Sequence, residues 1–297
     1  MKRTLLFFLL AILLITSLSA VGDAQQKPKC PPPPAHGGKK TIKCPKTLNS
    51  IEDCLDTGCG SVDPLLNIRK NMTEGNLNNA RDITFAEFAA LPKLVDGYCH
   101  IGDPRKPLKD KGEGDMVRVV AWALDARPQK TRGNDENGKP KRGETCNCGF
   151  TGRDDPENTD VHIVLVDDET LKLKAKATAA KPATATKKAV PARSATQNTL
   201  KKREAQSQTA EFAPRLRVAL HDRFDGAKLK SLINPAKGGR LQVRVTGLLM
   251  YDSEHAVGPN QLLRRSDWEV HPVFRLEFCP KGKICAGGDW INLNSAP

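Results

Sequence analysis

A series of apolar segments with strand-like patterning constrains the fold of this 297-residue chain most strongly. Residues 115–126 contain Met-Val-Arg-Val-Val-Ala-Trp-Ala-Leu, and apolar residues also dominate residues 159–167. Residues 240–252 and 268–279 have the same character. Apolar residues at every second position, or in a short continuous run, indicate β-strands that bury one or both faces. These segments predict a mainly β core.

A helix is expected before the last two strands. Pro214 suits a first helical position, and apolar residues four positions apart line one face of residues 214–224 before an Asp-Gly stop. With a short middle strand at 144–150, the predicted order is three strands, a helix and two strands. This is the order of a five-stranded OB-like barrel with one helix between strands 3 and 4. A two-layer αβ sandwich is the alternative.

Two residues inside the predicted strands favour the barrel. Gly247 lies within the fourth strand, where a tight barrel bend uses glycine. Pro272 lies within the last strand and predicts a bulge or an edge there.

Composition divides the chain into segments with different expected structures. The segments are a signal peptide (1–24), a disordered Pro/Lys-rich arm (25–47), a small Cys-containing cap region (48–110), the first part of the barrel (111–170), a disordered Lys/Ala/Thr-rich insertion (171–208), and the second part of the barrel with a C-terminal tail (209–297).

The cap region contains one predicted helix. This helix begins after Thr84 with a capping box completed by Glu87, and it predicts a small cap that packs on the barrel.

The net charge of +13 comes from three short segments rather than from the core-forming part. Residues 2–3, 25–46 and 172–203 hold eighteen of the 47 basic residues. The rest of the chain contains the remaining 29 basic residues and 33 of the 34 acidic residues, so its net charge is slightly negative. This distribution excludes a wholly basic domain of the histone or ribosomal kind.

The N-terminus predicts export. Lys2 and Arg3 precede an apolar run over residues 5–15 and then small residues, which is the pattern of a cleaved signal peptide. The run is shorter than the roughly 20 residues that span a bilayer. We therefore expect a periplasmic or extracellular protein with no stable membrane span after processing.

Nine cysteines agree with an oxidising compartment. Cys54 and Cys59, and likewise Cys279 and Cys285, are close enough in sequence to form local disulfides. The odd total leaves at least one thiol unpaired. Zinc is the competing interpretation, but the chain lacks paired CxxC knuckles.

The candidate catalytic residues are Asp160, His162, Glu269 and His271. Each pair is spaced i, i+2 in a predicted strand, so its two side chains share one face. If the two faces met, imidazoles and carboxylates could bind a divalent metal or transfer protons. The alternative is that both histidines are ordinary structural residues stabilised by the adjacent carboxylates. Because the sequence does not decide between the two interpretations, we assign no catalytic residue and no cofactor.

Short segments resemble staphylococcal-type nucleases, which are also OB-type barrels. These are Gly-Asp115-Met-Val at the start of one strand and Val-Leu-Val-Asp167 at the end of another. The resemblance implies calcium-assisted phosphodiester hydrolysis with Asp115 and Asp167 as metal ligands. However, His162 falls near the family's phosphate-binding arginine and Thr170 near its general base, which argues against an active nuclease of that type.

A broader resemblance covers residues 48–285. Thr-Asp-Val-His-Ile-Val-Leu-Val at 159–166 and Ser-Asp-Trp-Glu-Val-His-Pro-Val at 266–273 look like signatures of uncharacterised exported bacterial proteins with an OB-like domain. This resemblance implies a fold but no activity.

For ligand binding, Arg118, Arg240 and Arg244 are the candidates, because strand alternation places them on one outer face. The basic insertion adds lysines that can neutralise phosphates or other anionic groups; a solvated spacer is the alternative. We therefore predict an exported binding or envelope-associated protein, with a polyanion such as nucleic acid or an acidic envelope polymer as partner. The alternatives are a metal-assisted hydrolase of the phosphodiesterase kind and a structural envelope protein without ligand.

Overall fold

The computed structural model describes residues 64–92, 106–128, 160–183, 191–213, 226–252, 264–286 and 288–295. The chain divides into two compact units, and all described residues lie in the unit formed by Gly38–Lys93 and Arg105–Pro297. The predictions for the signal peptide, the Pro/Lys-rich arm and the Cys54–Cys59 pair fall outside the described residues. Within the described ranges, no helix is both long and apolar enough to cross a membrane.

The described residues form strands, α-helices and short 3-10 helices. The strands are β1 (Arg81–Ile83), β2 (Met116–Pro128), β3 (Val161–Val166), β4 (Gln208–Phe212), β5 (Leu241–Tyr251), β6 (Trp268–Phe278) and β7 (Ile291–Asn292). The helices are α2 (Pro64–Lys70), α3 (Phe85–Ala90), α4 (Lys106–Lys109), α5 (Asp168–Lys172), α6 (Ala195–Glu204) and α8 (Gly226–Ile233), with 3-10 turns η2 (Leu77–Asn79), η3 (Pro235–Lys237) and η4 (Leu293–Ser295).

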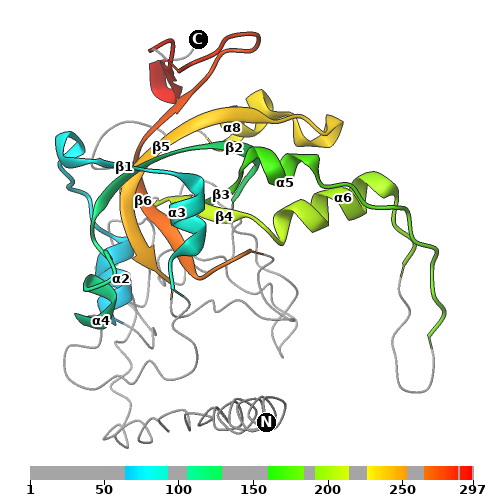
Figure 1. Cartoon of the computed structure of the whole chain (residues 1–297), viewed down its shortest axis with the longest axis horizontal. Coiled ribbons are helices and arrows are strands. Elements are labelled where there is room, and N and C mark those ends of the chain that lie inside the picture. The colour runs from blue at the N-terminus through cyan, green and yellow to red at the C-terminus, as the bar shows by residue number, and fades with distance from the viewer. Residues whose placement is uncertain are drawn as a thin grey trace, which may run out of the picture. The chain divides into compact units, whose positions relative to one another are not determined.

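Five strands close into a barrel in the order β2-β3-β4-β6-β5, and β5 pairs back to β2 (Figure 1). The β4–β6 pair is parallel, whereas the other four pairs are antiparallel. Helix α8 lies between the third and fourth barrel strands, β4 and β5. The predicted five-stranded OB-like barrel is therefore confirmed.

Alternate residues of the barrel strands build its core. Register places Val119 opposite Val245 and Ala123 opposite Leu165, so their side chains share the inner face. Burying a valine, leucine or phenylalanine contributes about 1.5–3 kcal/mol relative to leaving it exposed. Inner-face residues with 0% exposure include Val117, Val119, Ile163, Leu165, Ala210, Phe212, Val243, Val245 and Leu276.

The bend at Gly247 has a steric cause. The β5–β6 register shifts on both sides of this residue. A Cβ at Gly247 would lie 2.4 Å from the carbonyl oxygen of Pro272, so only glycine permits this approach. The predicted glycine bend and the predicted bulge at Pro272 therefore occur at one place.

The strand numbering differs from the expected numbering. Residues 159–167 were expected to form the third barrel strand, but β3 is the second and β4 is the third. The expected middle strand at 144–150 and the expected helix at 214–224 lie outside the described residues. The basic insertion consequently joins the second and third barrel strands.

The described part of the insertion is ordered, which corrects the prediction of disorder for residues 171–208. Helix α6 begins with a capping box made by Ser194 and Gln197, which satisfies two backbone N–H groups. Arg203 donates to the carbonyl oxygens of Leu171 and Leu173 and so ties α6 to the preceding segment. Figure 1 shows α6 and its neighbouring segment extending away from the barrel. Residues 184–190 are outside the described ranges.

The cap region contacts the barrel, as expected. Thr84 and Glu87 form the predicted capping box of α3, and Phe88 beneath it is fully buried. Gln208 Nε2 donates to the Phe88 carbonyl oxygen at 3.2 Å, and Trp268 Nε1 donates to the carbonyl oxygen of Pro92 at 2.9 Å. These bonds fix the cap against β4 and β6.

Candidate functional site

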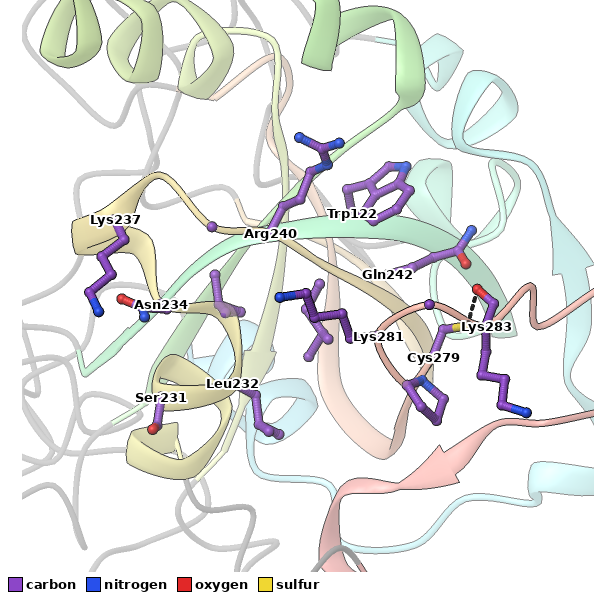
Figure 2. A pocket seen from close by; sticks show the side chains of 15 residues that line it. Trp122, Ser231, Leu232, Asn234, Lys237, Arg240, Gln242, Cys279, Lys281 and Lys283 are labelled. Atoms are coloured by element: carbon purple, nitrogen blue, oxygen red, sulfur yellow. Dashed lines mark hydrogen bonds between the residues drawn. The ribbon is translucent and has the colours of Figure 1, made fainter.

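A basic pocket lies between the α8–β5 connection and the loop after β6. It has a volume of about 530 Å³, which is within the usual range of small-ligand sites. We define the basic pocket by Trp122, Lys237, Arg240, Lys281 and Lys283, which all line it. Figure 2 shows Lys281 directed into the hollow, with Arg240 and Trp122 on the neighbouring wall.

Two tight turns create the walls of the basic pocket. On one side, Asn234 and Gly238 adopt left-handed conformations at the two ends of η3 and turn the chain back into β5. On the other side, the predicted disulfide between Cys279 and Cys285 closes a short loop. Gly282 has a φ of +83° at the tip of that loop, which favours glycine.

The electrostatics of the basic pocket favour an anion. Its fifteen lining residues include three lysines and an arginine, and none of the fifteen is acidic. Four like charges around one concave surface attract anionic groups. The Arg240 guanidinium carbon lies 5.4 Å from the centre of the Trp122 ring, and this cation–π contact holds the arginine at the wall. Trp122 is fixed in turn by an Nε1 bond to Asp168 at 2.7 Å.

The three predicted arginines differ in how their charges are balanced. Arg118 Nη1 lies 3.2 Å from Asp82. Arg244 donates to both carboxylate oxygens of Glu277 at 2.7 Å. Register places Arg118 and Arg244 on the same outer face, as the alternation predicted. Their charges are compensated by carboxylates, so Arg240 is the member of the set that adds its charge to the basic pocket.

A second group of polar side chains is buried against the barrel. We call it the buried polar cluster and define it by Lys70, Asp160, His162, Glu211, Asp252, Arg264, Glu269 and His271. The cluster unites the four candidate catalytic residues. His162 lies opposite Glu211 across β3–β4, and the parallel pairing of Thr209 with Glu269 brings Glu211 beside His271.

Glu211 is the centre of this arrangement. Its Oε1 lies 2.9 Å from His162 Nε2, and its Oε2 lies 3.0 Å from His271 Nδ1. The same nitrogen of His271 lies 3.4 Å from Glu269 Oε1. Burial alone would raise the pKa of Glu211, but His162 and His271 outweigh burial and hold that pKa well below its usual range.

Buried ion pairs hold the other end of the cluster. Arg264 binds Glu269 at 2.7 Å and Asp252 at 3.1 Å, and Lys70 of α2 lies 3.8 Å from Asp252. Burial opposes the charge on Arg264, but Glu269 and Asp252 outweigh it and raise the pKa of the guanidinium. Burial raises the pKa of Glu269, and the carboxylates of Glu211 and Asp252 add to the rise.

The metal ligands implied by the nuclease resemblance are not brought together. Asp115 precedes β2, whereas Asp167 follows Val166, which pairs with Trp122. The antiparallel register therefore puts Asp167 level with Ala121, six residues along the strand from Asp115, or about 20 Å at 3.3 Å per residue. Asp115 is half exposed and lies 3.8 Å from Arg81, and Asp167 caps α5 by accepting a bond from the Thr170 N–H.

Sequence reasoning missed Glu211, Arg264, Asp252, Lys70 and the pocket lysines. One signal for Glu211 was available, since Gln-Thr-Ala-Glu-Phe places Ala210 and Phe212 on one face and Glu211 on the other. Comparison with other proteins assigns no function to either group of residues. No protein-family model, curated protein or solved structure matches this chain.

Proposed function

We propose that this protein binds anionic polymers that carry phosphate groups, with the basic pocket as the binding site on the barrel. The observation that carries the proposal is a hollow of about 530 Å³ that four basic residues line and no acidic residue lines. Phosphate groups are recognised by lysine and arginine in such surfaces, and affinity then falls as salt rises.

The basic insertion supports the same function. Residues 172–203 hold ten lysines or arginines and no acidic residue. Lys174, Lys176, Lys181 and Lys201 are exposed and lie on the described parts of this segment. Such a segment lengthens the track that a flexible polyanion can follow from the basic pocket.

Burial of the polar cluster favours binding over hydrolysis. A metal-assisted hydrolase needs its acid, base or metal within reach of substrate and water. Glu269 and His271 are 0% exposed and Glu211 is 1% exposed. The four candidate catalytic residues do converge, but in packed surroundings.

Export is part of the proposal. The apolar N-terminal run supports secretion. The Cys279–Cys285 disulfide is compatible with an oxidising compartment. In the periplasm or outside the cell, extracellular nucleic acid and phosphate-bearing envelope polymers both present the required chemistry.

The proposal is tested by fluorescence anisotropy with labelled single-stranded DNA at 0.1 M salt. The variant with both Arg240→Ala and Lys281→Ala should bind about 20-fold more weakly, since each lost phosphate contact weakens single-strand binding roughly fivefold at this salt. Arg275→Ala is the matched control, because Arg275 is exposed on β6 and does not line the basic pocket.

Three results would count against the proposal. Full affinity in the double variant would place the binding surface elsewhere and overturn the assignment. Equal binding of a phosphate-free polyanion such as polyglutamate would contradict the preference for phosphate. Shortening of the DNA in a metal-dependent reaction would favour the hydrolase instead.

A further inference from the structure

The buried polar cluster brings together atoms of the kinds that bind metal ions. One such atom from each of Asp160, Glu211 and His271 lies within 4.8 Å of the other two. Atoms bound to one ion at about 2.1 Å stand roughly 3–4 Å apart. The separation of 3.0 Å from His271 Nδ1 to Glu211 Oε2 falls in this range.

Acceptor atoms outnumber protons at this point. One imidazole nitrogen carries at most one proton, yet Nδ1 of His271 faces the oxygens of two carboxylates. As far as the described residues show, Glu211 Oε2 and Glu269 Oε1 have no partner in hydrogen-bond geometry. Both side chains are at most 1% exposed, so water does not compensate them from bulk solvent. A cation bound to Glu211 Oε2 would satisfy that oxygen and leave the His271 N–H for Glu269 Oε1.

We infer that the buried polar cluster is a structural site for one divalent first-row transition metal ion, bound by Asp160, Glu211 and His271. Mixed imidazole and carboxylate ligands suit zinc or manganese, whereas calcium and magnesium prefer oxygen alone. Arg264 binds Glu269 Oε2 and thereby directs Oε1 toward His271. Metal sites commonly orient their ligands through such outer contacts.

The position of the site explains what the ion would do. The ligands come from the start of β3 and from β4 and β6, which are neighbours in the barrel. The parallel β4–β6 ladder contains only two residue pairs, Thr209 with Glu269 and Ala210 with Val270. An ion beside this short ladder would cross-link the strands where the barrel closes. Full burial of the ligands suits a structural site, which needs no open position for substrate.

The test begins with the wild-type full chain. Its metal content is measured as purified, and the ligand atoms are identified by X-ray absorption. The metal is then removed with a chelator, and thermal unfolding is followed as zinc, manganese or calcium is added. We expect one ion per chain with nitrogen and oxygen ligands, and a Tm increase of about 5–10 °C with zinc or manganese at a hundredfold excess over Kd. Calcium should leave the Tm unchanged.

Paired variants locate the site. Glu211→Gln keeps the shape of the side chain but should abolish the metal-dependent Tm increase. Glu113→Gln changes another buried carboxylate, which accepts a bond from the Tyr251 N–H, and should retain the increase. Sulfur ligands, no bound metal, or an undiminished Tm increase in Glu211→Gln would each overturn the inference. The wild-type measurements decide it even if the Glu211 variant does not fold.

Discussion

Replacing Arg264 with methionine should destabilise the protein far more than the same replacement at Arg244. Arg264 is 1% exposed in its side chain and bridges Glu269 at 2.7 Å and Asp252 at 3.1 Å. Removing one partner of a buried ion pair leaves an uncompensated buried charge and costs about 3–5 kcal/mol. For a domain of this size, that corresponds to a Tm decrease of about 6–20 °C. Urea unfolding followed by tryptophan fluorescence measures the change, because Trp268 is fully buried.

Arg244→Met is the matched control for Arg264→Met. Arg244 also has two carboxylate contacts, both to Glu277, but its side chain is 28% exposed. A partly solvated pair of this kind contributes about 1 kcal/mol or less. Adding Glu269→Gln to Arg264→Met should recover part of the lost stability, since it removes one uncompensated carboxylate. If Arg264→Met costs no more than Arg244→Met, the reasoning from burial is refuted.

Two further changes test the barrel and the wall of the basic pocket. Gly247→Ala should cost about 1–3 kcal/mol in urea unfolding, because its Cβ would meet the rigid Pro272 carbonyl. Gly75→Ala should cost less, because its Cβ would meet side chains alone, the end of Met116 and the ring of Phe274; equal costs would argue against a steric bend. Replacing both cysteines of Cys279–Cys285 with serine should cost about 2 kcal/mol for so short a loop and should weaken binding of labelled DNA, since the loop carries two pocket lysines. Unchanged affinity would show that the loop does not shape the site.

The sequence predicted the barrel strands that have an apolar period. β2, β3, β5 and β6 agree with the expected segments to within about two residues at each end, which is the usual uncertainty of such boundaries. β4 was missed, because its outward residues Thr209 and Glu211 face a buried polar layer and its five residues give too short a period. From its sequence, β4 therefore resembles the polar insertion that precedes it more than a barrel strand.

The candidate sites depended on contacts between distant parts of the chain. The i, i+2 rule placed Asp160 with His162 and Glu269 with His271, but their convergence required the parallel β4–β6 pairing. Alternation correctly placed Arg118 and Arg244 of the predicted arginine strip on one face. Its compensation was hidden, because Asp82 and Glu277 lie more than thirty residues from the arginines they bind.

The pocket lysines were visible in the sequence only as part of a disulfide loop. Lys237 and Lys281 belong to different connections, and the pairing of β5 with β6 places those connections beside each other. No local pattern encodes this meeting. The pairing of β5 with β6 therefore creates the basic pocket, whereas the sequence shows only the separate segments that line it.

The salt dependence of DNA binding tests the central claim most directly. The affinity of wild type for labelled single-stranded DNA is measured between low and moderate salt and compared with that of a variant carrying Lys237→Gln, Arg240→Gln, Lys281→Gln and Lys283→Gln. Each phosphate contact contributes about 0.7 to the slope of log affinity against log salt, so the variant's slope should be shallower by about 3. Arg275→Gln should change the slope little, because Arg275 does not line the basic pocket. An unchanged slope in the four-residue variant would contradict binding at the basic pocket.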